Sequence, residues 1–277
     1  MTKKIKPSSV ILNVVVVCIA FTCVFPLVWL LYSSLKTEDA FLGRPFDLPT
    51  IPLQWENFYH ALVRSKIANY FFNTLIYAVG AVLLVLFFAF CIGYCMSRYR
   101  FRGKALVTGL LTLGMVVPAY ALLVPMYMQY NILGIVNTRG VLMFPYLAVN
   151  LPLGVFLIEA YIKNIPYEME QAAQLEGANL FQTITQVIIP MSKPILITVA
   201  ILTFNFVWNE MPFALVLTPN EKIRNMAVGL MNFASGYDAN FTYRLAACVV
   251  GLIPVTLLYI IFNRQIIKGM TEGSVKG

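Results

Sequence analysis

Long apolar stretches separated by short polar ones make up most of the chain. Six of them are long enough to form membrane-spanning helices: residues 10–33, 70–96, 105–129, 139–162, 195–217 and 243–265. A hydrocarbon core about 30 Å thick requires roughly 20 apolar residues in a helix. The pattern predicts an all-α polytopic membrane protein with six spans. We divide it into a first span with its polar loop (residues 1–69) and a helical membrane domain (residues 70–277).

The composition supports a membrane protein. Hydrophobic residues make up 60% of the chain and charged residues 12%, against about 25% charged residues in a typical soluble domain. The first apolar stretch follows Lys3, Lys4 and Lys6, as in a signal peptide. However, it is too long for a signal-peptide core and lacks a small-residue cleavage site. We interpret it as a retained helix.

The positions of the basic residues predict the topology. The net charge of +8 could indicate a nucleic-acid partner, but the basic residues are distributed as membrane topology requires. Short loops rich in Lys and Arg favour the cytoplasm, and "SRYRFRGK", residues 97–104, joins the second and third predicted spans. We expect both termini in the cytoplasm and no nucleic-acid partner.

The chain offers little for metal or catalytic chemistry. All five cysteines lie in apolar stretches, where we expect them to pack between helices. Cys91 and Cys95 lie one helical turn apart and could alternatively share a ligand. His60 is the only histidine, so neither a histidine-based metal site nor a catalytic triad is available. We predict no metal site and no catalytic residues.

The chain also lacks a phosphate-binding loop. A nucleotide site of the Gly-x4-Gly-Lys-Ser/Thr type needs glycines that let backbone N–H groups surround the phosphates. The single Gly-Lys pair, Gly103 and Lys104, is followed by Ala105. We predict that this chain binds no cofactor and is not an enzyme.

Prolines interrupt two predicted spans. Pro118 and Pro125 lie in the third, while Pro145 and Pro152 lie on either side of Asn150 in the fourth. Proline leaves carbonyl groups unpaired, which hydrocarbon does not tolerate unless other groups supply donors. These spans either face a protein-lined path or contain kinks that serve only packing.

Two polar segments on the predicted outer side have apolar positions. "WENFYHALV", residues 55–63, has helical spacing and predicts a short helix on the outer face. The loop 218–242 has an apolar centre at Met226, Val228, Leu230, Met231 and Phe233. We predict either an exposed interaction surface there or a loop that folds back on the helices.

The segment "EQAAQLEGANLFQTITQVIIP", residues 170–190, predicts two short helices between the fourth and fifth spans. Pro166 suits a first helical turn, Gly177 separates the helices, Asn179 is a suitable N-cap, and Pro190 is expected to end the second helix. An apolar stripe follows at helical spacing, formed by Leu180, Phe181, Ile184, Val187 and Ile188. Either the helix bundle covers this stripe, or a groove on another protein does.

This segment resembles the cytoplasmic EAA loop of ABC importer permeases. Ala172, Ala173, Gly177 and Pro190 keep the spacing of that loop. Gln171 replaces its glutamate, and Glu170 lies one position earlier. This departure removes a charge that the family often places at the contact with the ATPase.

Other stretches extend the resemblance over nearly the whole chain. They are "FPLVWLLYSSLK", "NTLIYAVG", "YCMSRYRFRGK", "FNFVWNEMPF" and "QIIKGMTEGSVKG". Together they resemble carbohydrate-uptake permeases of the type of the maltose transporter's smaller permease subunit. The resemblance implies a type I ABC importer permease fold and transport of a sugar, with an oligosaccharide as the expected substrate.

The same resemblance implies a coupling role for the loop and a set of partners. The loop, residues 165–190, would dock in a cleft of a cytoplasmic ATPase; its implied coupling residues are Glu170, Gln171, Ala172, Ala173, Gly177, Phe181 and Pro190. The implied partners are a paralogous permease, two ATPase subunits that bind ATP and Mg, and an extracytoplasmic sugar-binding protein. The implied location is the bacterial plasma membrane.

A polar group in the fifth span is our candidate for the sugar path. Asn205, Trp208, Asn209 and Glu210 combine amides that can pair with hydroxyl groups and an aromatic face that suits a sugar. Polar groups at membrane depth usually face a cavity. The alternative is structural: Asn209 and Glu210 form hydrogen bonds between helices, and Trp208 anchors an interface.

Three competing functions are an ion-coupled secondary transporter, an ABC permease for a non-sugar solute such as a glycerophosphate, and a structural subunit that recruits the ATPase. An ion-coupled transporter needs a relay of buried ionisable groups, and Glu210 is nearly alone in the predicted spans. Uptake that requires ATP and a binding protein distinguishes an importer from the ion-coupled alternative.

Overall fold

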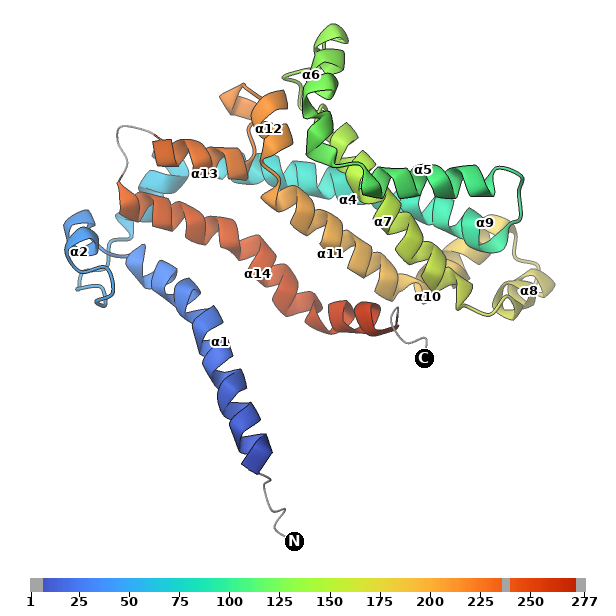
Figure 1. Ribbon diagram of the computed structural model, residues 1–277, viewed down its shortest axis with the longest axis horizontal. Coiled ribbons are helices and arrows are strands. Elements are labelled where there is room, and N and C mark those ends of the chain that lie inside the picture. The colour runs from blue at the N-terminus through green and yellow to red at the C-terminus, as the bar shows by residue number, and fades with distance from the viewer. Residues whose placement is uncertain (1–6, 236–239, 273–277) are drawn as a thin grey trace. The chain divides into compact units, whose positions relative to one another are not determined.

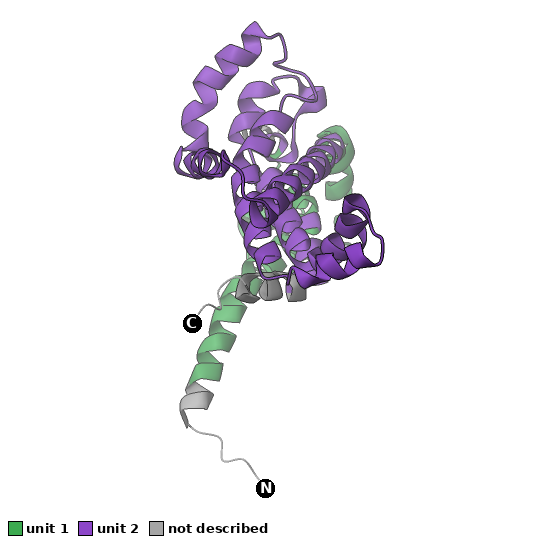
Figure 2. Ribbon diagram, turned by 90° about the vertical axis from the view of Figure 1, so that its right-hand side faces the viewer, with its two compact units in different colours: residues 1–68, 230–253 green, residues 69–229, 254–277 purple. Residues whose placement is uncertain are grey.

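The computed structural model describes residues 7–235 and 240–272, with side chains described over 12–231 and 240–263. All regular secondary structure in these residues is helical (Figure 1), which confirms the all-α prediction. The chain divides into two compact units (Figure 2). Unit 1 comprises residues 1–68 and 230–253, and unit 2 comprises residues 69–229 and 254–277.

Unit 1 contains α1 (Pro7–Ser33), α2 (Glu38–Gly43), α3 (Glu56–Tyr59), the π-helix η1 (His60–Arg64) and the start of α14 (Phe241–Glu272). The helix predicted over 55–63 is therefore confirmed. The Glu38 carboxylate accepts hydrogen bonds from the first backbone N–H groups of α14, at 3.0 Å from Phe241 and 3.2 Å from Thr242. The His60 ring stacks on Tyr243 with ring centroids 4.6 Å apart. These contacts attach the polar loop to the start of α14.

The helices of unit 2 follow from α4 to α14. Their bounds are α4 (Ile67–Arg98), α5 (Lys104–Val116), η2 (Ala119–Leu122), α6 (Leu123–Ile132), α7 (Met143–Lys163), α8 (Glu168–Leu175), α9 (Leu180–Thr183), η3 (Ile184–Ile188), α10 (Ile189–Met191), α11 (Lys193–Asn209), α12 (Pro212–Leu217), η4 (Glu221–Ile223) and α13 (Met226–Ser235), which runs into unit 1, followed by the second part of α14.

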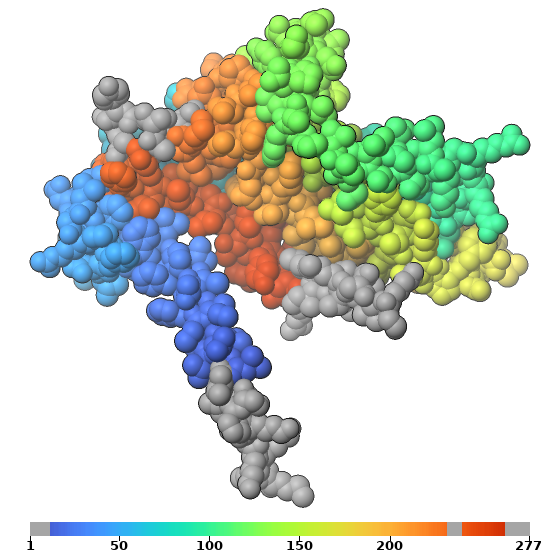
Figure 3. Space-filling view, viewed as in Figure 1, coloured from blue at the N-terminus to red at the C-terminus, as the bar shows by residue number. Residues whose placement is uncertain are grey.

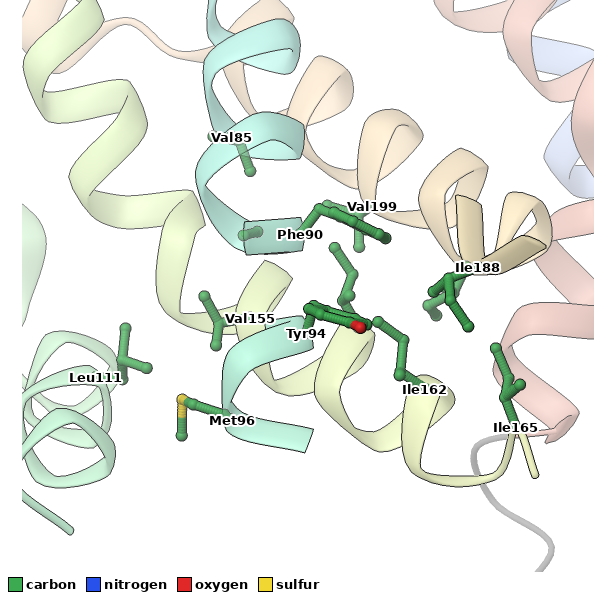
Figure 4. Close-up of a cluster of buried hydrophobic side chains, with 13 residues drawn as sticks. Val85, Phe90, Tyr94, Met96, Leu111, Val155, Ile162, Ile165, Ile188 and Val199 are labelled. Atoms are coloured by element: carbon green, nitrogen blue, oxygen red, sulfur yellow. The ribbon is translucent and has the colours of Figure 1, made fainter. Parts of the chain in front are cut away.

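The core of unit 2 consists of two apolar clusters, and α4, α7 and α11 contribute to both. One cluster gathers Phe90 and Tyr94 of α4 with Ile162 of α7 and Ile188 of η3 (Figure 4). Small residues let the helices approach closely: a Cβ atom on Gly93 would lie 3.1 Å from the Glu159 backbone nitrogen. Such packing is typical of membrane helices, where apolar surface alone does not drive association.

Two predicted spans are broken. Within the described residues, four helices are long and apolar enough to cross a membrane alone, and two bent helix pairs raise the number to six if each pair forms one span. α5 ends before Pro118, which cannot continue the helical hydrogen bonds, and the chain turns by 90° into η2 and α6. The second bent pair joins Leu180–Met191 to α11 at 73°. α11 ends at Asn209, within the predicted span 195–217, and α12 follows as a separate helix.

α6 is largely uncovered in the isolated chain. None of its residues is buried, and its side chains lie on the surface of unit 2 (Figure 3).

The six-span count and the cytoplasmic location of both termini stay predictions.

Of the two alternatives for the 218–242 loop, the structure favours a loop that folds back on the helices. Met226 and Val228 of α13 are buried, and Leu230 and Met231 are half-buried; Phe233 lies outside the described side chains. The expectation for the cysteines is wrong. Four cysteines, Cys18, Cys23, Cys91 and Cys95, are exposed on helix surfaces and do not pack between helices of this chain.

Candidate coupling segment and transport path

The segment from Ile165 to Met191 forms the predicted pair of short helices. α8 ends in a Schellman motif, in which the Ala178 N–H donates to the Ala173 carbonyl and the Gly177 N–H to the Gln174 carbonyl, both at 3.0 Å. Gly177 adopts φ of +89°, a left-handed conformation that favours glycine. The reversal between α8 and α9 therefore depends on the backbone freedom of Gly177, since no atom within 4 Å would meet a Cβ there.

α9 begins at a capping box. The Asn179 side chain accepts from the Gln182 N–H, and the Gln182 side chain accepts from the Asn179 N–H, both at 2.9 Å. Reciprocal bonds of this kind satisfy two backbone donors that a helix start leaves unpaired. Asn179 is thus the N-cap that its position predicts.

The second helix does not end at Pro190. Pro190 lies near the start of α10, after the π-helix η3, and helical conformation continues to Met191. Proline is tolerated in a first helical turn because its missing N–H would have no partner there. The chain then enters α11 at Lys193.

The apolar stripe of α9 and η3 has one covered and one uncovered part. Ile188 is buried, and Ile184 and Val187 pack against the same apolar cluster. By contrast, Leu180 is 51% exposed and Phe181 75% exposed. The bundle covers the end near α11, and the end near Gly177 stays available for another protein.

Further exposed side chains adjoin Phe181. Leu175, at the end of α8, is 90% exposed, and Gln171, Ala172 and Gly177 are also exposed, while Ala173 is half-buried. An apolar groove of about 490 Å³ runs beside Leu180 and Phe181, between them and α4. Most of the residues proposed for ATPase coupling therefore lie on an accessible surface around the α8–α9 turn.

Glu170 differs from the other predicted coupling residues because it is 2% exposed. Its carboxylate accepts from Arg98 Nε at 2.5 Å and from the Tyr94 hydroxyl at 2.8 Å. Both partners belong to α4. The structure thus places Glu170 inside the protein, where it attaches α8 to the end of α4.

Arg98 and Tyr94 were not among the candidates from the sequence. Arg98 was interpreted only as a topology signal within a basic turn. Glu170 was a candidate for an ion pair, because a buried carboxylate needs a basic partner. The sequence does not indicate whether Glu170 is buried, or which of the arginines in the turn 97–104 would pair with it.

The four candidate path residues divide into two pairs. Asn205 and Asn209 are exposed on α11, and the Asn209 amide donates to the Asn205 backbone carbonyl at 2.8 Å and to its side-chain oxygen at 3.1 Å. Trp208 is buried, stacked on Phe204 at 5.4 Å and edge-on to Phe71 at 5.3 Å. Only the asparagine pair is accessible to a solute.

Glu210 has a structural environment. It is buried, and its carboxylate accepts from the Phe213 N–H at 2.6 Å, the Ala214 N–H at 3.2 Å and the Tyr146 hydroxyl at 2.9 Å. These bonds cap the start of α12 and join it to α7. The alternative proposed for Glu210, a hydrogen bond between helices, describes this geometry, whereas Asn209 bonds within its own helix.

The family of binding-protein-dependent transport system inner membrane components matches residues 89–272 of this chain. The chain belongs to this family. Residues 89–272 include the α8–α9 segment, α11 and the segment between α12 and α14. The chain is therefore the membrane component of a transport system and not an enzyme.

Curated relatives are similar over most of their length. A putative ABC transporter permease protein of Caldicellulosiruptor is 31% identical, covering 91% of each chain. The diacetylchitobiose uptake system permease protein NgcG of Streptomyces coelicolor is 30% identical, over 91% of this chain and 84% of the relative. The trehalose/maltose transport system permease protein MalG of Thermococcus litoralis is 30% identical, over 97% of both.

A solved structure shares the fold. A chain of a bacterial ABC transporter that imports the acidic polysaccharide alginate superposes with a TM-score of 0.83 at 24% identity, over 95% of this chain and 99% of the other. This similarity establishes an ABC importer permease fold for this chain.

Proposed function

We propose that this chain is a permease subunit of an ATP-driven, binding-protein-dependent importer of an oligosaccharide. The observation that carries the proposal is family membership combined with an exposed two-helix segment around Gly177. Curated relatives named for diacetylchitobiose, trehalose/maltose and melibiose/raffinose/stachyose support the substrate class.

One chain supplies only part of the transporter. A paralogous permease completes the path, two ATPase subunits bind ATP and Mg in the cytoplasm, and an extracytoplasmic binding protein delivers the sugar. The protein spans the bacterial plasma membrane several times, with both termini in the cytoplasm. The basic turn 97–104 supports this orientation.

The α8–α9 segment docks in a cleft of one ATPase subunit. Gln171, Ala172, Ala173, Gly177 and the exposed Phe181 form the docking surface, and Pro190 lies where the segment returns to α11. A capped and hydrogen-bonded segment transmits a displacement that a flexible loop would absorb. Closure of the ATPase dimer therefore moves the helices that flank the segment.

The sugar path passes the exposed amides of Asn205 and Asn209. Carboxamide groups both donate and accept hydrogen bonds, which suits sugar hydroxyl groups. Trp208 and Glu210 hold α11 and α12 in position behind them. This pairing assigns solute contact to the asparagines and support to the other two residues.

Reconstitution tests the proposal. The complete complex in liposomes is expected to take up radiolabelled trehalose or diacetylchitobiose only when internal ATP and the sugar-loaded binding protein are both present. Vesicles without this subunit serve as the control. Uptake driven by a proton or sodium gradient in the absence of ATP would instead establish a secondary transporter, and ATP-dependent uptake of glycerophosphate but no sugar would overturn the substrate class.

A further inference from the structure

Glu170 is the only residue of α8 that is buried. The other side chains of this helix are exposed, apart from the half-buried Ala173. A buried carboxylate is costly unless it is paired and hydrogen-bonded. α8 also packs against α9 and η3, and Glu170 is its one side chain buried against α4.

The partners of Glu170 form a joint at the end of α4. Arg98 and Tyr94 occupy the two oxygens of the Glu170 carboxylate, and Arg98 also donates to the Ile165 carbonyl at 2.9 Å. The side chains of Arg98 and Glu170 are only 8% and 3% exposed. An ion pair at this depth is screened much less than one on the surface. The last turn of α4 thus holds α8 at two points, before its first turn and within it.

The other end of α4 holds the segment between α12 and α13. The Asn73 amide donates to the carbonyls of Lys222 at 2.9 Å and Arg224 at 3.0 Å, and the Tyr77 hydroxyl donates to the Ile223 carbonyl at 2.7 Å. This segment, residues 221–226, follows α12 and lies on the outer side in the proposed topology. Side chains of α4 thus donate hydrogen bonds to three consecutive backbone carbonyls of this segment. A displacement of α4 is therefore expected to move the segment with it.

Between its two ends α4 is continuous. It runs for 32 residues with no internal proline, whereas α7 contains Pro152 and α14 contains Pro254. At 1.5 Å per residue, Asn73 and Arg98 lie about 38 Å apart along the helix. Proline is a common cause of sharp kinks in helices, and α4 has none.

We propose that α4 is a connecting rod between the coupling helix α8 and the outer segment 221–226. Arg98, Tyr94 and Glu170 form its inner joint, and Asn73 and Tyr77 form its outer joint. All five are positioning residues. The inference rests on the proposed function: ATPase closure moves α8, α4 moves with it, and the outer segment shifts where the binding protein delivers its sugar.

The test compares variants of the two joints in the complete reconstituted complex. Glu170→Gln removes the ion pair at nearly constant shape. Tyr77→Phe combined with Asn73→Leu removes the three bonds to the carbonyls of residues 222–224, while Tyr70 and Thr74 keep their bonds to Glu221 and Met226. Each variant is expected to leave the ATPase subunits co-purifying with the permease, while stimulation of ATP hydrolysis by the sugar-loaded binding protein falls about tenfold. A variant that carries the changes of both joints is expected to lose no more stimulation of ATP hydrolysis than either joint variant alone, because both joints belong to one connection.

Glu159→Gln is the matched control. It breaks a different ion pair, Glu159 with Lys163 at 2.7 Å, and both of these residues belong to α7. Stimulation in this variant is expected to match the wild type. If Glu170→Gln does not fold, Tyr94→Phe removes a single bond to the same carboxylate and is expected to lower stimulation in the same direction.

Three results would overturn the proposal. The first is normal stimulation of ATP hydrolysis in a folded variant of the inner joint, and the second is loss of ATPase co-purification in Glu170→Gln. The third is a variant of both joints in which the two losses of stimulation multiply. Failure of the proposed function is distinguishable, because it would appear in the wild-type complex as absent sugar uptake.

Discussion

At the scale of single residues, burial separates side chains that the sequence presents as equivalent. Asn209, Trp208 and Glu210 are close neighbours in the chain, yet only Asn209 is exposed. Glu170 and Gln171 are adjacent on α8, and only Glu170 is buried. A helix turns about 100° per residue, so neighbours in sequence face different surroundings. We therefore propose solute contact for Asn209 and a packing role for Trp208.

This division gives a residue-scale prediction. Asn209→Ala is expected to lower ATP-dependent sugar uptake about fivefold, the effect of losing one hydrogen bond of about 1 kcal/mol, with little change in the melting temperature of the complex. Trp208→Ala is expected to destabilise the fold by about 3–5 kcal/mol because it empties a packed aromatic site. Uptake rates and thermal melting in detergent measure both. Normal uptake in Asn209→Ala would remove it from the path.

At the scale of elements, the α8–α9 segment is stabilised locally and attached at a distance. Its turn uses only its own backbone, through the Schellman motif at Gly177 and the capping box at Asn179. Its attachment uses Arg98, which lies 72 residues earlier in the chain than Glu170. Local signals therefore predicted the two helices, whereas the attachment required the fold.

The exposed end of the segment gives an element-scale prediction. Phe181→Asp places a charge where docking requires an apolar contact, and central aromatic residues of interfaces contribute about 2 kcal/mol or more. The ATPase subunits are expected to be lost when the membrane complex is purified through a tag on the permease. Asn164→Asp adds the same charge at another exposed position and is expected to keep the ATPase bound. Retention of the ATPase by Phe181→Asp would show that docking lies elsewhere.

At the scale of the whole molecule, the number and orientation of spans depend on the broken helices. Among the described residues four helices qualify alone, and the pairs bent by 90° and 73° bring the number to at most six. In the proposed topology α11 is the crossing part of the second pair, and Leu180–Met191 stays on the cytoplasmic side. With both termini in the cytoplasm, the number of crossings has to be even. The turns at Arg102 and Gln174 then face the cytoplasm, and Asn220 faces the outside.

Cysteine labelling tests this arrangement. In a variant without the natural cysteines, Asn220→Cys is expected to react with a membrane-impermeant maleimide in intact cells. Arg102→Cys and Gln174→Cys are expected to react only after the membrane is permeabilised. Labelling of Gln174→Cys from outside would contradict the proposed cytoplasmic location of α8.

Much of the architecture was predictable from local patterns. Apolar length predicted the membrane helices, and glycine, asparagine and alanine spacing predicted the α8–α9 pair. Proline and burial decided what the local patterns left open or misjudged. The chain bends at Pro118 within a predicted span, and Met226 and Val228 are buried, which decides between two alternatives. The expected helix end at Pro190 was wrong.

The sequence by itself determined the helical class, the membrane setting, the family resemblance and the reversal at Gly177, because each depends on composition or on residues close together in the chain. Only the tertiary structure decided that Glu170 faces inward to Arg98, that Trp208 and Glu210 support α11 and α12 while Asn209 stays exposed, and that α4 joins α8 to residues 221–226. These outcomes depend on which distant surfaces meet, and the free energy of burial or ion pairing is gained only when they do.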